Sequence, residues 1–334
     1  MDNDNITLAH GAGGRLMHEL IDSLFIKVFA NDALRQKRDS AIVEIGGKKI
    51  AFTTDSYVVN PIIFPGGDIG SLAVYGTVND LSVCGAKPLY ISLGLIIEEG
   101  FEKKTLERIV ASIERAAKRA GVRVVTGDTK VVEKGACDKM FINTSGIGEI
   151  SYIPNEKKIR SGDVVIVSGP IGDHAISVLS KREGIAFRTT IRSDSAPLNG
   201  LIARVINTSS KVRFMRDPTR GGLATTLNEA VEHRSFGILL NEKSIPVRSG
   251  VKEACELLGY DPLYCACEGR VVMIIAQEDA QKVMMALRRD ALGESASVIG
   301  TVTKDYKGKV ILRTAAGGKR IVDMLSGEQL PRIC

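Results

Sequence analysis

The chain has 334 residues, of which 44% are hydrophobic and 25% are charged, as in globular proteins large enough for two domains. A mild net charge of +6, the absence of Trp and an aromatic content of only 5% argue against nucleic-acid binding. A polar, acidic start and short apolar runs argue against a signal peptide and membrane spans, so we expect a cytoplasmic protein.

The first half of the chain mixes helix and strand patterns. The glycine-rich stretch His10-Gly11-Ala12-Gly13-Gly14 precedes a helix whose apolar residues recur every fourth position. The clearest amphipathic pattern lies at 105–120 and stops at Gly121, a usual helix C-terminus. The expected elements are helices at 15–29, 69–83 and 105–120 and strands at 41–45, 49–53, 89–96, 122–125 and 141–147. They predict an α+β domain over residues 1–153, with the strand at 122–125 short and buried.

A polar stretch at 153–158 is expected to link this domain to a second one. The elements expected beyond it are strands at 163–168, 270–275 and 309–313 and helices at 223–233, 251–258 and 279–288. This pattern predicts an α/β domain over residues 154–316, so the fold class is that of a two-domain α+β and α/β protein. Residues 317–334 are expected to form a flexible tail.

Three aspartates stand where strands or helices are expected to end: Asp55, Asp80 and Asp128. Carboxylates at such positions suit Mg²⁺, which takes oxygen ligands and usually keeps several waters. Any one of them taken alone is more often a turn or cap residue. Lys130, two positions after Asp128, makes the group as a whole more typical of a site for a metal and a phosphate chain.

Phosphate binding has two further candidate segments, although the sequence has no Walker-type loop. Gly11, Gly13 and Gly14 either present backbone N–H groups to phosphate oxygens or form only a flexible loop. The run Asp217-Pro218-Thr219-Arg220-Gly221-Gly222 offers a helix N-terminus and a guanidinium for an anion, or simply a capped helix start. Glu268, just before a strand, is either an ordinary edge charge or a general base.

The chain ends in Pro331-Arg332-Ile333-Cys334, which places a thiol on its last residue. The cysteine is not fourth from the end, so the motif is not a prenylation signal. Taken alone, a terminal cysteine is more often without a chemical role. With no chain beyond it, however, its sulfur is able to swing between sites and to carry a covalent group.

These residues together resemble the hydrogenase maturation factor family HypE. The resemblance runs from the glycine-rich start to the last residue, and its internal motifs are shared with aminoimidazole ribonucleotide synthetase, selenophosphate synthetase and thiamine monophosphate kinase. Only the terminal Pro331-Arg332-Ile333-Cys334 separates HypE sharply from these relatives. The internal motifs are His10-Gly11-Ala12-Gly13-Gly14, Thr54-Asp55-Ser56-Tyr57, Asn79-Asp80, Thr126-Gly127-Asp128-Thr129-Lys130-Val131-Val132, Arg216-Asp217-Pro218-Thr219-Arg220-Gly221-Gly222 and Glu268-Gly269.

The resemblance implies an aminoimidazole ribonucleotide synthetase-like fold. It implies that the N-terminal domain forms a β-barrel across a homodimer interface, beside a C-terminal α/β domain and a mobile tail. ATP is then expected between the domains, with Mg²⁺ on Asp55, Asp80 and Asp128. The residues expected to contact the nucleotide are Gly11, Gly13, Gly14, Asp55, Asn79, Asp80, Thr129, Asp217, Thr219 and Arg220.

The resemblance also implies a reaction. Cys334 is expected to receive a carbamoyl group from the carbamoyltransferase HypF, and ATP then drives dehydration of the S-carboxamide to an S-cyanide (thiocyanate). The cyanide passes to a HypC–HypD complex for the [NiFe] hydrogenase site. Lys130 is expected near the γ-phosphate or the carbamoyl oxygen and Glu268 as the base. Arg332 is expected to lower the pKa of the Cys334 thiol, or else to grip a partner or seat the tail.

Two other functions compete with this one. The first is another ATP-dependent superfamily activity such as selenophosphate synthesis, although the first cysteine is Cys84, so the N-terminal loop holds no reactive thiol. The second is a carrier that shuttles a thiol-bound group without catalysis. The acidic residues with Lys130 argue against a pure carrier, which needs no site for Mg·ATP.

Overall fold

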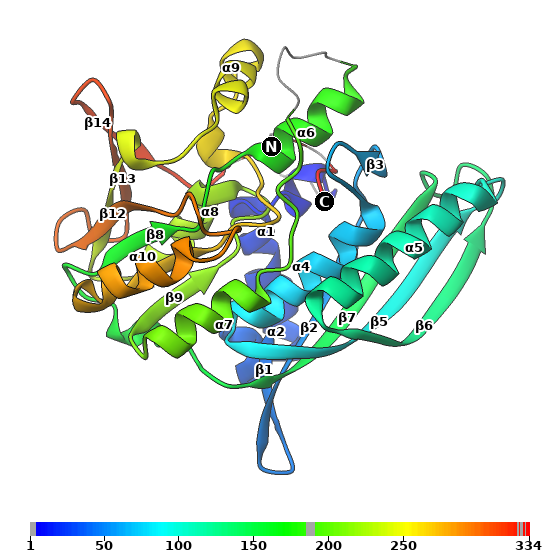
Figure 1. Ribbon diagram of the computed structural model, residues 1–334, viewed down its shortest axis with the longest axis horizontal. Coiled ribbons are helices and arrows are strands. Elements are labelled where there is room, and N and C mark those ends of the chain that lie inside the picture. The colour runs from blue at the N-terminus through cyan, green and yellow to red at the C-terminus, as the bar shows by residue number, and fades with distance from the viewer. Residues whose placement is uncertain (1–4, 185–190, 326, 328–329, 331) are drawn as a thin grey trace.

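The computed structural model describes residues 5–184, 191–325, 327, 330 and 332–334, and it places two α/β halves side by side (Figure 1). A five-stranded sheet of order β1-β2-β7-β5-β6 organises the first half. Only β5 and β6 run parallel; the other neighbours are antiparallel. The strands are β1 (Ala41–Ile45), β2 (Lys48–Tyr57), β5 (Ala86–Glu98), β6 (Arg123–Val132) and β7 (Met140–Ile150), with a small β3–β4 hairpin at Ile63–Phe64 and Gly67–Asp68.

Two helices cover one face of this sheet. Helix α4 (Ile69–Val83) packs on β2, β7 and β5, and α5 (Lys103–Ala120) packs on α4. Because α4 lies between the sheet, α5 and the second half, almost all of its side chains are buried. Helix α5 buries one stripe only and ends at Gly121, whose φ of 70° is a conformation that glycine adopts without strain.

A helical segment precedes the sheet. It runs without a break through α1 (Arg15–Leu20), a π-helical stretch (Ile21–Ile26) and α2 (Lys27–Phe29), and the short α3 (Asp32–Arg35) follows. The predicted helix at 15–29 is thus confirmed, with a π segment at its centre that periodicity does not reveal. A turn of 3₁₀ helix, Leu8–Gly11, lies before it.

A seven-stranded sheet of order β14-β13-β10-β12-β8-β11-β9 forms the second half. Helices α7 and α10 pack on one face, and α8 packs on the other. The strands are β8 (Val164–Val167), β9 (Val212–Arg216), β10 (Gly237–Asn241), β11 (Val272–Ile275), β12 (Ser297–Thr303), β13 (Val310–Arg313) and β14 (Lys319–Val322). The helices are α6 (Asp173–Arg182), α7 (Asn199–Thr208), α8 (Gly222–Val231), α9 (Ser249–Leu258) and α10 (Ala280–Arg288), with 3₁₀ turns at Glu156–Lys158, Glu242–Ser244, Pro262–Tyr264 and Gln277–Asp279.

The predicted element at 122–125 is wrong in extent and burial. It is the start of β6, which continues to Val132 and is exposed along nearly its whole length. The apolar Val122-Arg123-Val124-Val125 pattern suggested a buried strand, but β6 lies at the sheet edge. The sequence pattern also missed α6, α7, β9, β10, β12 and β14, whose short apolar runs fit helix and strand equally well.

The predicted tail does not begin as free chain. Strand β14 pairs with β13, so Lys319–Val322 belongs to the second sheet. The divisions at 153 and 316 stay predictions, as does the barrel across a dimer, because the five-stranded sheet of one chain is open at β1 and β6. Within the described ranges, the structure contains no helix long and apolar enough to cross a membrane.

Candidate functional site

A cavity of about 410 Å³ lies where the N-terminal helical segment, β2, α4 and the start of α8 meet. It gathers residues that are far apart in the sequence. Those among its lining that the sequence predicted as site residues are Gly13, Asp55, Asp80, Asp217, Thr219, Arg220, Glu268 and Cys334. The cavity is therefore the candidate active site.

Sheet topology explains why these residues meet. Asp217 directly follows β9, and Glu268 shortly precedes β11. Because these two strands are antiparallel neighbours, the end of β9 lies beside the start of β11, and both carboxyls lie at the same end of the second sheet. Asp55 lies inside β2 on the face toward α4, where Asp80 accepts a hydrogen bond from Thr53 (3.0 Å). Asp55 and Asp80 therefore stand within elements, not at their ends as the sequence suggested.

The cavity holds more buried carboxyls than its cations balance. Burial raises the pKa of Asp55, and burial with repulsion from Asp217 raises that of Asp80 well above its usual range. Burial, with the charge of Asp39, raises the pKa of Asp217 to about 8. Burial and nearby carboxylates also raise the pKa of Glu268 well above its usual range. Bound cations would relieve this repulsion.

The donor set fits part of the predicted magnesium site. Asp55 and Asp80 line the same cavity and offer carboxylate oxygens, the ligands that Mg²⁺ prefers. Asp128, the third predicted ligand, lies on the exposed strand β6 and outside the cavity lining. Across the described ranges, no three His, Cys, Asp or Glu side chains converge closely enough to hold a metal ion.

The glycine-rich turn packs against the start of α8. Nη1 of Arg220 donates to O of Gly11 (3.1 Å), and a Cβ on Gly13 would stand 2.8 Å from Cβ of Arg220. Gly13, at φ 77°, lines the cavity, whereas Gly14 packs on O of Leu325 and Gly11 lines a smaller adjoining cavity of about 80 Å³. The backbone at Gly13 and the Arg220 guanidinium are thus groups of a kind that binds an anion.

The C-terminus lies against the N-terminal half, with Arg332 in a left-handed turn conformation (φ 51°). Val58 N donates to O of Cys334 (3.1 Å), and Asn60 N donates to O of Arg332 (3.2 Å). Ile333 is buried in a hydrophobic cluster formed by residues of both halves, and its O is hydrogen-bonded to Nε2 of His174 (2.8 Å). We call this set of contacts the tail seat. Pro331 lies outside the described residues.

The tail seat brings Cys334 into the cavity with an uncharged sulfur. Burial, helped by the charges of Glu268 and Asp55 and opposed by Arg220, raises the pKa of its thiol to about 12. Arg332 instead pairs with Asp138 (Nη1 to Oδ2, 2.6 Å) and donates to O of Val58 (2.9 Å). The prediction that Arg332 lowers the thiol pKa is wrong for this arrangement, because its guanidinium faces Asp138; the alternative, that Arg332 seats the tail, agrees with these contacts.

Asp138→Asn is expected to weaken the tail seat. A partly exposed ion pair contributes up to about 1 kcal/mol, so the equilibrium constant for seating should fall by up to roughly fivefold. Because a seated thiol is partly buried and protonated, Cys334 reacts with iodoacetamide through the unseated tail, and we expect its alkylation to quicken by up to that factor. Mass spectrometry of the C-terminal peptide measures it. Glu156→Gln, which breaks the similarly exposed pair with Arg234 (3.0 Å), is the control; equal alkylation in both variants would contradict the seat.

The predicted residues on β6 do not reach the cavity of their own chain. Lys130 Nζ lies 3.0 Å from Oδ2 of Asp128, and their side chains are 70% and 69% exposed. Thr129, between them, is exposed as well. A motif does not encode which elements the fold brings together, so the sequence alone did not show that these residues lie outside the cavity.

Asn79, predicted to bind nucleotide, is fully buried and outside the cavity lining. Its side-chain amide donates to O of Ala196 (3.1 Å) and O of Glu268 (3.3 Å) and accepts from N of Leu198 (2.8 Å). The amide is thus used to join α4 to the second half. The nucleotide-binding role is corrected accordingly.

Seven cavity residues with acidic or basic side chains were not predicted: His18, Asp22, Lys37, Arg38, Asp39, Arg216 and Glu229. Four of them form a connected network. Nη1 of Arg216 lies 2.6 Å from Asp39 and 3.5 Å from Glu229, and Glu229 lies 3.1 Å from Nε2 of His18. The hydrogen bond that His18 donates to Glu229 raises the pKa of His18 despite its partial burial. Arg216 stands beside Asp217 in the quoted motif, which was a usable signal; the others become neighbours only through folding.

The comparisons with known proteins agree with this fold. Models of the AIR synthase related protein N-terminal and C-terminal domains match residues 37–150 and 160–313. The chain is 49% identical to carbamoyl dehydratase HypE of Bradyrhizobium diazoefficiens over 99% of this chain and 97% of that protein. It resembles a crystal structure of HypE in complex with ATP (48% identity, TM-score 0.83, 98% and 100% of the two chains). It also resembles HypE in a HypE–HypF complex (45% identity, TM-score 0.86, 92% and 99%).

Proposed function

Since this chain belongs to the HypE family of carbamoyl dehydratases, with the two-domain AIR synthase-like fold, we propose that it converts an S-carboxamide on Cys334 to an S-cyanide, using ATP. The observation that carries the proposal is the position of the last residue. Cys334 lines the same cavity as Glu268, Asp55 and Arg220, so a group bound to its sulfur enters a site with a base, acids and a phosphate-binding cation.

The thiol of Cys334 can receive the carbamoyl group only when the tail has left the tail seat. A seated thiol that is largely covered and has a pKa of about 12 is protonated at neutral pH and out of reach of a large donor enzyme. Away from the cavity the sulfur regains an ordinary pKa, and its thiolate attacks the carbamoyl carbon while the donor's leaving group departs. HypF is the proposed donor, supported by the HypE–HypF complex of a relative. This step is why we propose that the C-terminal residues are mobile.

Dehydration follows when the loaded tail returns. The carboxamide oxygen becomes a good leaving group once it accepts the γ-phosphoryl group of ATP. Glu268 then takes a proton from the nitrogen, the C–O bond breaks, and phosphate leaves with the oxygen. The second N–H proton leaves with the departing phosphate, which leaves S–C≡N on Cys334. A raised pKa makes the Glu268 carboxylate a stronger base than an ordinary glutamate.

The negative charge of the phosphates is proposed to be neutralised by Mg²⁺, which acidic residues hold, and by the cations of the cavity. Mg²⁺, when bound, would neutralise phosphate charge, with Asp55 and Asp80 of this chain as its proposed ligands. Arg220 and the backbone at Gly13 are proposed to hold phosphate oxygens, beside Asp217 and Thr219. The ATP complex of a 48% identical HypE supports nucleotide binding.

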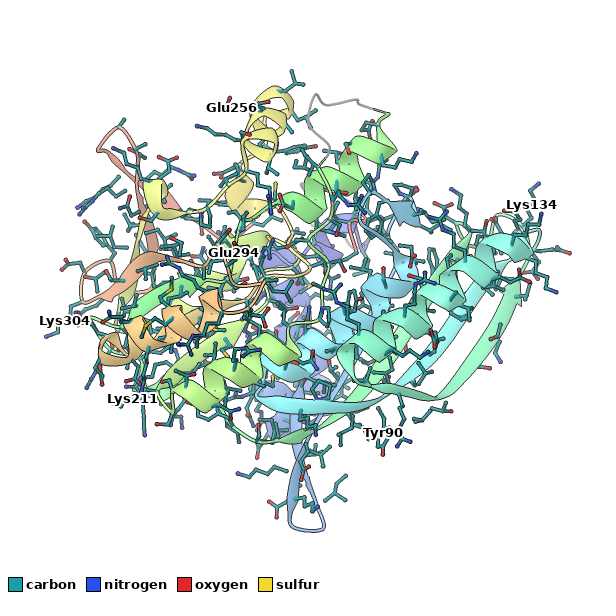
Figure 2. All side chains as sticks on the ribbon, viewed as in Figure 1. Tyr90, Lys134, Lys211, Glu256, Glu294 and Lys304 are labelled. Carbon is teal, nitrogen blue, oxygen red and sulfur yellow. The ribbon has the colours of Figure 1, made fainter. Side chains whose placement is uncertain are left out.

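We propose that a second copy completes the site with Asp128, Thr129 and Lys130. In the strand register, Lys130 lies opposite Ile96, and Phe52 lies opposite Ile147. These residues are on the sheet face away from α4 and α5, where Figure 2 also places Tyr90. An apolar face beside an unpaired edge strand is typical of a protein interface. The exposed apolar residues of this sheet are Val43, Ile45, Phe52, Ile96, Val124, Val125, Val131 and Ile147. Two such faces would close into the barrel that the family resemblance implies.

Mixing two inactive variants tests whether Lys130 acts on the partner's cavity. If it does, a heterodimer of Lys130→Ala and Glu268→Ala has one intact site, whereas a Lys130 acting within its own chain leaves none. We expect each variant alone to be inactive and an equilibrated 1:1 mixture to regain about a quarter of wild-type dehydration, because half the dimers are mixed and half their sites are intact. No recovery after confirmed subunit exchange would contradict the arrangement.

The remaining assignments complete the proposal. The cyanide is proposed to pass to HypC–HypD in the cytoplasm for [NiFe] hydrogenase. The proposed domain division is a nucleotide-binding domain at 1–153, an α/β domain at 154–316 and a tail at 317–334. Mass spectrometry of the C-terminal peptide tests the function as a whole. A carbamoyl donor should add one carbamoyl group, and ATP should then remove one water. A loaded peptide that ATP leaves unchanged would favour a carrier, and ATP-dependent selenophosphate formation would favour the synthetase alternative.

A further inference from the structure

A stretch of irregular chain, residues 191–198, connects three parts of the molecule beside the cavity; we call it the bridging segment. Ser193 N donates to O of Pro65 in the first half (2.8 Å). Its hydroxyl bonds to Nδ1 of His174 (2.8 Å), whose other ring nitrogen bonds to O of Ile333 (2.8 Å). The bridging segment is therefore in hydrogen-bond contact with the first half and, through His174, with the tail seat.

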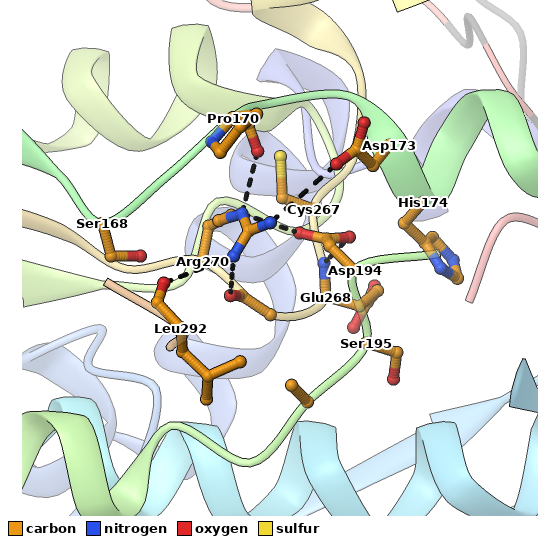
Figure 3. Close-up of polar contacts among 12 residues, drawn as sticks. Ser168, Pro170, Asp173, His174, Asp194, Ser195, Cys267, Glu268, Arg270 and Leu292 are labelled. Carbon is orange, nitrogen blue, oxygen red and sulfur yellow. Dashed lines mark hydrogen bonds and ion pairs between the residues drawn. The ribbon is translucent and has the colours of Figure 1, made fainter. Parts of the chain in front are cut away.

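The same segment holds the peptide of Glu268. Oδ1 of Asp194 accepts from the N–H of Glu268 (3.2 Å), and N of Ala196 donates to its O (3.4 Å). From helix α4, Nδ2 of Asn79 donates to that same O (3.3 Å). Both main-chain groups of Glu268 are thus fixed from outside their own loop, as Figure 3 shows for Asp194.

Asp194 is itself held in a fixed place. Its side chain is fully buried, with Oδ2 3.5 Å from Nε of Arg270. Arg270 in turn donates to O of Pro170 (2.8 Å) and O of Gly269 (3.2 Å), as drawn in Figure 3. A Cβ on Gly269 would stand 1.8 Å from O of Asp194, so only glycine permits this approach. A rigid acceptor of this kind orients the group that it binds.

The carboxyl of Glu268 is not held in this way. Its Oε1 is buried and has no hydrogen-bond partner among the residues that the structure describes. The side chain is left free to meet a substrate, so its position depends on the main chain at Glu268. A displacement of about 1 Å in a reacting group costs up to about 100-fold in rate.

We propose that Asp194 and Asn79 are positioning residues that hold Glu268 where its carboxylate takes the proton from the carbamoyl nitrogen. The inference rests on the proposed function, in which Glu268 is the base. Two roles for Asn79 can then be distinguished. A nucleotide ligand would change the affinity for ATP, whereas a positioning residue changes the rate of the chemical step. The tail seat and the base are then aligned by one bridging segment.

The test uses full-length protein with Cys334 carbamoylated by cyanate, and follows loss of water from the C-terminal peptide after ATP is added. For Asp194→Ala and Asn79→Ala we expect kcat to fall about 10- to 100-fold, with KM for ATP unchanged within about twofold. Asp194→Asn keeps an acceptor for the N–H of Glu268 and should retain activity within about tenfold of wild type. This rescue distinguishes the hydrogen bond from general packing.

Asp163→Ala is the matched control. Asp163 is equally buried, with Oδ2 accepting from N of Arg160 (3.0 Å) and lying 3.7 Å from Nε of Arg213. Its variant should lose stability but keep kcat within about twofold.

Wild-type kcat in folded Asn79→Ala, or an Asp194→Asn as slow as a folded Asp194→Ala, would overturn the inference. If Asp194→Ala does not fold, Asn79→Ala decides: a lower kcat at unchanged KM supports positioning, and a raised KM at wild-type kcat overturns it. Glu268→Gln separates this inference from its premise, because normal turnover there would remove the base itself.

Discussion

Cys334→Ala is expected to yield no carbamoylated and no cyanated product, while ATP binding stays within about twofold of wild type. The reason is chemical: the thiolate is the nucleophile, and alanine leaves nothing in the cavity to carry the carbamoyl group. The change removes only the sulfur and keeps the main-chain contacts of the tail seat, so the cavity should remain formed. Mass spectrometry of the C-terminal peptide and calorimetric titration with ATP measure the two effects.

Cys137→Ala is the control for this experiment, because Cys137 is the other cysteine that is not fully buried. It should load and dehydrate like wild type. Cyanide release from Cys334→Ala would show that another group carries the carbamoyl. Loss of ATP binding in Cys334→Ala would count against a tail that leaves its seat during the cycle.

Glu268→Gln is expected to stop dehydration with little effect on loading. General base catalysis contributes about 10²- to 10⁴-fold, and the amide cannot accept the proton. The variant should load its thiol normally, because loading takes place outside the cavity. It should also unfold at the same temperature as wild type or higher, since it removes a buried ionisable group that has an unpaired oxygen. Single-turnover assays on pre-loaded protein and thermal unfolding measure these effects.

Glu98→Gln serves as its control. Glu98 accepts hydrogen bonds from N of Gly135 (2.6 Å) and N of Lys139 (3.2 Å), outside the cavity, and the amide oxygen can replace one of its acceptors. Its dehydration rate should stay within about twofold of wild type. Equal losses in both variants would mean that the effect of Glu268→Gln is not specific to the base.

Elements with strong periodicity could be predicted from the sequence, and the reason is local. Helix α5 has a full apolar stripe and a glycine stop, and α4 a long apolar run between Asp68 and the turn at Gly85; both were predicted within two residues. The burial of β6 was not predictable in this way. Its apolar residues look like those of a core strand, and only the sheet order shows that β6 is an edge.

The same distinction between local pattern and tertiary arrangement applies to the site residues. The motifs identified the chemical types at Asp55, Asp217, Arg220 and Glu268, because phosphate and metal chemistry restricts which residues serve. They did not show that Asn79 turns its amide to Glu268 and not to a ligand. Hydrogen-bond partners of a buried amide come from distant segments, and a motif does not encode them.

The sequence by itself determined the family, the elements with clear periodicity and the presence of a terminal thiol, because these follow from local order and residue chemistry. The tertiary structure alone decided which residues meet. Packing of the two halves brings Cys334 and Glu268 to one cavity and leaves Lys130 on an exposed edge. It also joins Asp194 to the Glu268 peptide across 74 positions of chain. Such meetings depend on long-range burial and strand order, which no stretch of sequence contains.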